Sequence, residues 1–332
     1  MTDRAPLGPL LRAFFADHLV QQKAVSPQTI HAYRDAFRLL LTFLDQHRRR
    51  KPEALTLDDL DAPVILAFLD HLEEDRANSV QSRNARLAAV RSFVRFAALR
   101  APESVDLTSR VLAIPCKRAP RRQVHYLTRP EMDAILTACD RSTHGGRRDH
   151  ILLLTLYNTG ARVSELVALR RSHVRFGAAT VVQLLGKGRK ERAVPLWPRT
   201  GRGLRQWFDE EGEATPDYAF RNARGDRLTR QGVTHLLDQA CRRARERCPS
   251  LPAQRVSPHV IRHTTAMHLL QAGVDVATIA LWLGHERLET THHYVEADLQ
   301  LKERALRKLD PLGQSTRRFK ADSSLLTFLA SL

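Results

Sequence analysis

A basic stretch that contains two prolines divides this chain near residue 115. It runs over residues 114–123 as IPCKRAPRRQ, with four basic side chains and no acid. Proline has no backbone N–H and its ring clashes with the preceding helical turn, so this stretch cannot continue a helix. An ordinary linker between domains fits these residues, and so does an extended strap along a polyanion backbone. The two interpretations are compatible, and both place a domain boundary here.

The first hundred residues show the spacing of α-helices. Ser26 is a good N-cap followed by proline at the first helical position, and apolar residues then recur at steps of three and four. Asp61 and Ser79 open two further segments of the same kind. These patterns predict an all-helical domain over residues 1–112, followed by a basic linker over residues 113–125.

The predicted helix after Ser79 carries arginines opposite its apolar stripe. Most charged runs of this kind are solvated helix faces. This one has no interleaved glutamate, so pairing between residues four apart cannot explain it. We interpret the face, together with the cations of the linker, as a surface that faces phosphates. Its residues are Arg83, Arg86, Arg91 and Arg95 on the helix, and Lys117, Arg118, Arg121 and Arg122 in the linker.

The charge balance also points to a polyanionic partner. The chain has 53 Lys and Arg against 36 Asp and Glu, a formal net charge of +17, and nucleic acid is the commonest partner of such an excess. The four cysteines form no Cys-x-x-Cys pair, which is typical of reduced thiols. No apolar run approaches the roughly 18 residues of a membrane span, and the N-terminus lacks a signal-peptide pattern. We therefore expect a cytoplasmic, nucleoid-associated protein with no membrane partner and no disulfide framework.

Beyond the linker the pattern is mixed. Strands predicted over residues 180–185 and 192–196 flank the turn Gly186-Lys187-Gly188 as a β-hairpin. The predicted fold class is mainly α with a small β-hairpin or sheet, in which an all-α N-terminal domain precedes a mixed α+β domain over residues 126–310. Helices of this second domain are predicted over residues 131–138, 149–157 and 163–169, from Thr229, from Pro258, and over residues 275–283.

The C-terminal tail, residues 311–332, has a pattern of its own. A basic patch precedes Asp322, and apolar residues then recur at helical steps as far as Leu332. This predicts an amphipathic last helix. Packing onto its own domain and exchange between protomers are both compatible with the pattern.

Four short segments carry side chains suited to chemistry. They are TGARVSEL (159–166), GKGRKER (186–192), PHVIRH (258–263) and LGH (283–285), the last followed by TTHHY (290–294). Each alone is a weak signal, because an arginine at a helix start usually lies at the surface and Gly-Lys-Gly is a common turn. His259 and His263 have the i, i+4 spacing of some zinc ligands. However, Arg262 between them would repel a cation and no His-Glu-x-x-His pattern occurs, so we expect no metal and no other cofactor.

Taken together and in this order, the segments resemble the signature of the tyrosine recombinase (phage integrase) family: Arg, Lys, His-x-x-Arg, His, Tyr. The resemblance covers residues 126–309, and the N-terminal helices resemble the family's SAM-like core-binding domain. The chain has room for one such domain and none for an arm-binding domain, so it resembles the simple two-domain recombinases of the Xer kind. The matched catalytic positions are Arg162, Lys187, His259, Arg262, His285 and Tyr294.

The resemblance implies a role for each position. Arg162 and Arg262 match the two arginines that clamp the scissile phosphate, Lys187 matches the general acid, and Tyr294 matches the nucleophile. The two histidines match those of the His-x-x-Arg box and of the later His position. Glu165 falls at the family's acidic position behind the first arginine, where it has a supporting role.

The implied chemistry needs these residue types. A phosphodiester is anionic, and two guanidiniums can spread positive charge over its transition state while staying charged at any working pH. A tyrosine hydroxyl has a pKa of about 10, so a cationic pocket or a base such as His259 must help it lose its proton. Lys187 can protonate the leaving 5′-oxygen. The resulting 3′-phosphotyrosyl bond conserves the energy needed to rejoin strands without ATP.

The resemblance thus implies a site-specific recombinase that acts in integration, excision or resolution of DNA, as mobile elements and transposons require. The implied partners are double-stranded DNA with a specific recombination site and three further copies of the chain, as a homotetramer on two duplexes. An accessory recombinase or host factor would be compatible with this. Two alternatives stay open: relaxation of DNA as by a type IB topoisomerase, and a DNA-binding protein without catalysis.

Overall fold

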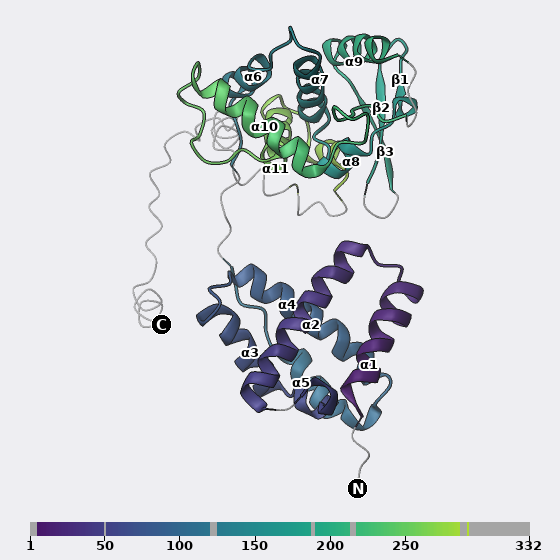
Figure 1. Cartoon of the computed structure of the whole chain (residues 1–332), viewed down its shortest axis with the longest axis vertical. Coiled ribbons are helices and arrows are strands. Elements are labelled where there is room, and N and C mark those ends of the chain that lie inside the picture. Colours follow the sequence, from purple (N-terminus) through teal and green to yellow (C-terminus); the bar gives the residue numbers. More distant parts are fainter. Residues whose placement is uncertain are drawn as a thin grey trace, which may run out of the picture. The chain divides into compact units, whose positions relative to one another are not determined.

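The computed structural model describes residues 5–49, 51–119, 125–186, 190–212, 217–285 and 291. It consists of two compact units, residues 1–121 and 122–332 (Figure 1). Each unit has its own apolar core.

The first unit is built from helices alone in its described residues. Its α-helices are α1 (Leu7–Ala13), α2 (Pro27–Arg48), α3 (Ala62–Glu74), α4 (Val80–Ala98) and α5 (Val105–Ala113), and a π-helical segment over Phe14–Gln22 continues α1. The predicted N-cap of α2 is confirmed, and the helices expected from Asp61 and from near Ser79 begin with caps of the same kind. The side chains of Ser26, Asp61 and Ser79 each accept a hydrogen bond from the backbone N–H three residues later, at 3.3, 2.9 and 3.2 Å.

Aromatic rings form the centre of this unit. Phe14 and Phe93 are fully buried, and their ring centroids lie 5.5 Å apart in an edge-to-face arrangement. Phe37 from α2 meets Phe93 from α4 in the same way at 5.2 Å. Such ring pairs stabilise a core beyond the area they bury, so the π-helical segment, α2 and α4 are held together by one aromatic cluster.

The second unit combines helices with a small sheet. The predicted hairpin is confirmed: β2 and β3 pair antiparallel with Val181 opposite Pro195 and Leu185 opposite Glu191, and β1 adds a third strand beside β2. The helices are α6 (Arg129–Thr137), α7 (His144–Thr159), α8 (Val163–Val167), α9 (Pro198–Glu211), α10 (Arg230–Arg245), α11 (Pro258–Gln271) and α12 (Val276–Leu283), and the strands are β1 (Val174–Arg175), β2 (Val181–Leu185) and β3 (Glu191–Pro195).

Helix α7 is the central element of this unit. Its residues from Ile151 to Thr159 are all buried, and it packs against α6, α9 and α11 (Figure 1). It ends at Gly160, which has a positive φ of 57°. A Cβ at this position would lie 2.5 Å from Leu283 Cδ2, so any other residue here would displace the Leu283 side chain as well as strain the backbone.

No helix in the described part of the chain is long and apolar enough to cross a membrane. The predicted tail helix, residues 311–332, lies outside the described residues.

Candidate active site

Three arginines converge on the C-terminal end of α12. They come from the N-cap of α8, from β3 and from α11. The last carbonyls of a helix have no partner within it and carry the negative end of its dipole, so they attract and orient guanidinium groups. The donor–acceptor pairs are Arg162 Nη2 to Gly284 O (3.3 Å), Arg192 Nε to Trp282 O (2.9 Å) and Arg262 Nη2 to Leu283 O (2.7 Å).

Arg262 also reaches the end of a second helix. Its Nη1 donates to the carbonyl of Gly160, the C-cap of α7, at 2.7 Å, and the residue is only 2% exposed. One guanidinium therefore joins the ends of α7 and α12 through two diverging nitrogens. The fork geometry of arginine makes this bridge, whereas a lysine ammonium has a single nitrogen at its tip.

Glu165 lies buried beneath two of these arginines. Its carboxylate accepts hydrogen bonds from the backbone N–H of Arg162 (2.8 Å), from Arg162 Nη1 (2.9 Å) and from Arg192 Nη1 and Nη2 (3.1 and 2.7 Å). Burial by itself would raise the pKa of this carboxyl, but the hydrogen bonds and charges of Arg192 and Arg162 outweigh it and leave the pKa below its ordinary value. Glu165 is therefore an anion that orients Arg162.

Three histidines accompany the arginines. His259 and His263 stand on α11 with ring centroids 4.4 Å apart, and His285 follows α12 with its Nδ1 2.8 Å from the hydroxyl oxygen of Thr291. Burial, and then the charges of Arg262 and Arg162, lower the pKa of His285 to about 4 and lower that of His259. Burial and the neighbouring His259 and Arg262 likewise lower the pKa of His263 to about 4. The imidazoles are therefore neutral near pH 7, and a neutral ring can donate one hydrogen bond and accept another.

The structure brings together four of the six predicted catalytic residues: Arg162, His259, Arg262 and His285. Lys187 and Tyr294 lie outside the described residues. The base of the hairpin that contains Lys187 is described, and Gly186 N–H donates to Lys190 O at 2.8 Å. A Cβ at Gly186 would lie 3.4 Å from Glu165 Oε1, so this end of the hairpin is beside the arginine cluster.

Two residues of the cluster were not predicted: Arg192 and His263. A signal for Arg192 exists in the strand alternation, because residues two apart share a face. Val194 is fully buried while Glu191, Ala193 and Pro195 are exposed, so Arg192 is a charge on the inward face of β3. The many basic residues around it concealed this signal.

The predicted phosphate-facing surface of the first unit needs a correction. Arg83 is 2% exposed, its Nη1 donates to Pro115 O at 3.2 Å, and its Nε lies 3.7 Å from the Glu73 carboxylate. The prediction that Arg83 lies on that surface is therefore wrong. Arg91 is half-buried and donates to Ile114 O. The chain after α5 returns across α4, and its backbone carbonyls need donors there.

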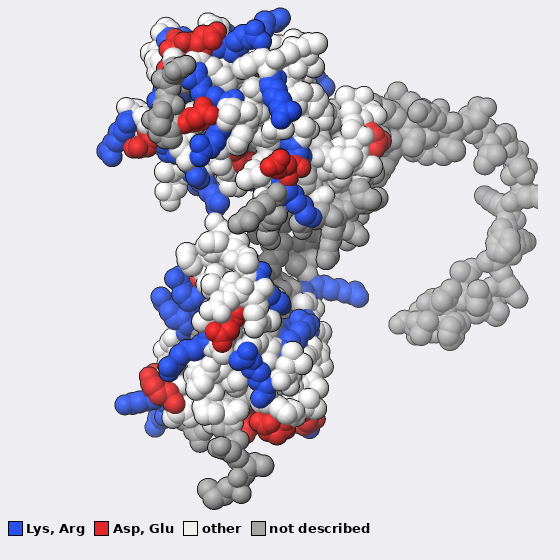
Figure 2. All heavy atoms as spheres, turned by 90° about the vertical axis from the view of Figure 1, so that its right-hand side faces the viewer, with Lys and Arg blue, Asp and Glu red and all other residues white. Residues whose placement is uncertain are grey.

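The other cations of this predicted surface vary in exposure. Lys117 is exposed but its Nζ lies 2.5 Å from Glu73 Oε2. Arg86 is half-buried, and Arg95 and Arg118 are exposed. Arg121 and Arg122 lie outside the described residues. Figure 2 shows basic side chains scattered over the visible face of each unit.

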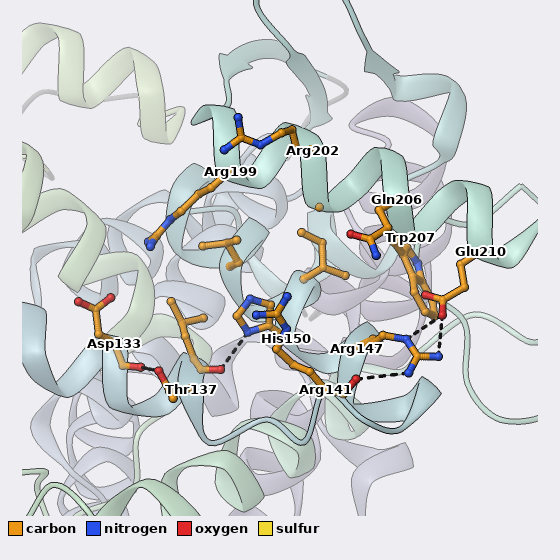
Figure 3. A pocket seen from close by; sticks show the side chains of 14 residues that line it. Asp133, Thr137, Arg141, Arg147, His150, Arg199, Arg202, Gln206, Trp207 and Glu210 are labelled. Carbon is orange, nitrogen blue, oxygen red and sulfur yellow. Dashed lines mark hydrogen bonds and ion pairs between the residues drawn. The ribbon is translucent and has the colours of Figure 1, made fainter.

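A separate cavity of about 570 Å³ lies between α6, α7 and α9. Figure 3 shows Arg141, Arg147, Arg199 and Arg202 around it. Arg147 is paired with Glu210 at 2.6 Å, and the Nδ1 of His150, also in its wall, lies 2.9 Å from a backbone carbonyl oxygen. None of the residues of the arginine–histidine cluster lines this cavity, so it is not the candidate active site.

The cluster at the end of α12 defines a class of site. Fixed guanidiniums beside neutral imidazoles bind an anionic phosphate and stabilise the charge that develops when it is attacked. The described residues contain no group of three or more His, Cys, Asp or Glu side chains that could hold a metal ion. The geometry is that of a phosphoryl-transfer site built on arginine.

Comparison with known proteins identifies the family. Residues 125–300 match the phage integrase family, and residues 13–101 match the N-terminal SAM-like domain of phage integrases. A Sinorhizobium fredii protein named as an integrase/recombinase, y4rC, is 49% identical over 332 residues, all of both chains. The tyrosine recombinase XerC of Pelobacter propionicus is 33% identical over 295 residues, 89% of this chain and 92% of XerC.

The fold has known counterparts as well. The crystal structure of the XerH site-specific recombinase bound to palindromic difH substrate superimposes with a TM-score of 0.67 at 20% identity, over 86% of this chain and 80% of that one. The chain belongs to the phage integrase family. It is a tyrosine recombinase, an enzyme that cuts and rejoins DNA.

Proposed function

We propose that this chain is a site-specific recombinase that works through a 3′-phosphotyrosyl intermediate. The hydroxyl oxygen of Tyr294 attacks the scissile phosphorus, a Tyr–O–P bond forms, and the bond from phosphorus to the 5′-oxygen breaks. Tyr294 loses its proton in this step and Lys187 donates one to the departing 5′-oxygen. Attack by a 5′-hydroxyl of another strand reverses the sequence, so rejoining needs no ATP, and the arginines supply the positive charge that a metal ion would otherwise provide.

One observation carries this proposal: residues far apart in sequence, and matched to the family pattern one by one, share a single site. Arg162 follows α7, Arg262 is on α11 and His285 follows α12, yet the guanidiniums of both arginines donate to carbonyls at the end of α12. A purely structural basic protein has no need of this convergence.

Arg162 and Arg262 differ in solvent exposure, and this difference supports different tasks for the two side chains. The side chain of Arg162 is 38% exposed and is held by Glu165 and by Gly284 O, so it can meet a phosphate with little loss of freedom. Arg262 is buried and fixes the ends of two helices. Its charge acts on the phosphate in a medium where electrostatic interactions are strong.

The neutral histidines fit proton transfer and hydrogen bonding to phosphate. Because the pKa of His259 is lowered, the ring is unprotonated near pH 7 and can accept the proton of Tyr294. His285, with its pKa near 4, can donate an N–H to a phosphate oxygen as a neutral ring. Glu165 supports the site from behind as the anion that orients Arg162.

We propose double-stranded DNA with a specific recombination site as the substrate and a homotetramer on two duplexes as the active assembly. The relative XerH is described as bound to its palindromic difH substrate, and the net charge of +17 fits a DNA partner. The proposed division is a core-binding domain (1–112), a basic linker (113–125), a catalytic domain (126–310) and a tail (311–332). In the linker, Arg118 remains exposed for phosphate contact, whereas Lys117 is paired with an acid of its own unit.

Covalent capture in cells tests this function. Cells are lysed in denaturant, the protein is recovered, and any DNA that stays attached is sequenced, with Tyr294→Phe as the control. We expect attached DNA concentrated at one locus and absent from the control. DNA attached evenly over the genome would favour topoisomerase-like relaxation instead, and relaxation of supercoils by a single protomer would support that alternative.

A further inference from the structure

Arg192 lies at the point where three elements of the site meet. It is the second residue of β3, directly opposite Leu184 of β2, and it follows the hairpin turn that contains Lys187. Its side chain is only 10% exposed. A charged side chain buried this far must be matched by partners, or its desolvation would be costly.

Each nitrogen of the Arg192 guanidinium has a protein partner. Nη1 and Nη2 donate hydrogen bonds to the two carboxylate oxygens of Glu165 at 3.1 and 2.7 Å, and Nε donates to Trp282 O at 2.9 Å. The Arg192 guanidinium therefore connects the hairpin to α8 and to the end of α12. Arg162 differs, because more than a third of its side chain is exposed.

The backbone before His285 packs against the Arg192 side chain. Gly284 has a positive φ of 67°, and a Cβ there would lie 3.1 Å from both Cδ and Nη1 of Arg192. The turn that leads from α12 to His285 thus packs directly on the Arg192 side chain. The carbonyl of Gly284 in turn accepts the hydrogen bond from Arg162.

We propose that Arg192 is a positioning residue for strand cleavage, acting through Glu165 on Arg162 and through the end of α12 on His285. The proposal rests on the function proposed above and goes beyond it, because Arg192 matches none of the catalytic positions of the family pattern. Because each guanidinium nitrogen of Arg192 is engaged within the protein and the side chain is buried, we expect its loss to slow cleavage and to leave DNA affinity unchanged.

The charges around Glu165 predict how the loss of Arg192 changes the pH dependence of cleavage. The described elements bring Arg162 from the start of α8 and Arg192 from β3 to its carboxylate. Arg262 on α11 is directed to the helix ends, and His285, with its low pKa, is neutral near pH 7. Removing Arg192 takes away the partner that holds the pKa of buried Glu165 down. The carboxyl is then protonated at higher pH, and Arg162 loses its anchor there.

The experiment measures single-turnover formation of the covalent complex on a nicked duplex that carries the captured site. The pH range starts at about 4.5, near the ordinary pKa of a glutamate carboxyl, and ends at about 8.5. We expect Arg192→Met to slow cleavage about tenfold or more and to move the acidic limb of the pH profile upward. Arg192→Lys keeps a charge beside Glu165, so it restores the position of the limb and part of the rate. Affinity for the same duplex, measured by fluorescence anisotropy, stays within about twofold of wild type.

A double-mutant cycle with Glu165→Gln shows whether the effect passes through Glu165. In that background Arg192→Met costs less than it does in the wild-type background, because its anionic partner is already gone and only the contacts with the end of α12 remain to be lost. Arg171→Met is the matched control, since Arg171 donates to the backbone carbonyls of Phe208 and Gly212 away from the site. It lowers stability and leaves the pH limb in place.

Three results would overturn the inference. The first is that Arg192→Met loses DNA affinity in parallel with cleavage. The second is that Arg192→Met slows cleavage equally in the presence and absence of the Glu165 carboxylate. The third is that the acidic limb of the pH profile stays in place in Arg192→Met. Should Arg192→Met fail to fold, Arg192→Lys in both backgrounds carries the same cycle. If wild type forms no Tyr294-dependent covalent complex, the proposed function fails as well; if it does and Arg192→Met matches it, only this inference fails.

Discussion

Replacing Arg262 with lysine tests the bridge between the ends of α7 and α12. Arg262 donates to Gly160 O and to Leu283 O, both at 2.7 Å, from separate nitrogens. A lysine keeps the charge but reaches one of the two carbonyls at most. The other is left buried without this donor, which costs about 1–3 kcal/mol.

The same substitution removes a fixed donor from the site. Loss of one oriented group that stabilises a transition-state oxyanion typically slows a reaction by about 10²–10³-fold. We therefore expect Arg262→Lys to unfold at lower urea concentration, by about 1–3 kcal/mol, and to form the covalent complex at least about a hundredfold more slowly.

Arg171→Lys is the matched control, because Arg171 also donates to two backbone carbonyls, of Phe208 and Gly212, but away from the cluster. It is expected to lose less stability than Arg262→Lys, because Gly212 is exposed and its carbonyl can bind water instead, and to cleave DNA at the wild-type rate once folded. Urea unfolding monitored by tryptophan fluorescence gives the stabilities, and a denaturing gel gives the covalent complex. An Arg262→Lys protein with wild-type stability and cleavage would refute the bridging role.

Three further outcomes follow from the same geometry. Gly160→Ala puts a Cβ 2.5 Å from Leu283 Cδ2 at a φ of 57°, so thermal unfolding should show a loss of at least about 1–2 kcal/mol. His263 and His285 have pKa values near 4 against an ordinary 6.5; below pH 6.5 the unfolded chain binds protons that the folded one does not, so stability falls as pH drops from 6.5 toward 4. In urea titrations, the stability of His263→Gln should fall less than that of wild type between pH 6.5 and 4. Addition of EDTA should leave the rate of covalent-complex formation unchanged, since guanidiniums supply the positive charge, and a rate restored only by added Mg²⁺ would contradict this.

Local signals in the sequence predicted most of the helices that begin with a side-chain cap, although α7, which Thr143 caps, begins at His144 and not at residue 149 as predicted. Asp275 before α12 and Thr229 before α10 are further examples, each accepting a hydrogen bond from the N–H three residues later, at 2.9 Å. Helix α9 was missed because it has no side-chain cap and contains two glycines. Its glycines lie where the helix packs closely on its neighbours, as at Gly203, where a Cβ would lie 2.7 Å from Ile151 Cδ1, and Leu204, Trp207 and Phe208 of α9 are buried. The contact at Gly203 involves α7, so no sequence pattern within α9 itself indicates it.

The candidate site was predicted as a set of residues but not as a network. The order of motifs indicated Arg162, His259, Arg262 and His285. The sequence could not show that Arg192 reaches Glu165 and Trp282, because each of these contacts joins residues more than twenty positions apart. The burial of Arg83 was unpredictable for the same reason, since it depends on the chain returning across α4 after α5.

The function proposed here depends on covalent attachment of Tyr294 to DNA within the site formed by these arginines. The most direct measurement is covalent capture from cells of wild-type protein and of Tyr294→Phe, followed by sequencing of the attached DNA. We expect DNA from one locus, joined through its 3′-phosphate, in wild type and none in the variant. Covalent DNA that persists in Tyr294→Phe would show that another residue is the nucleophile.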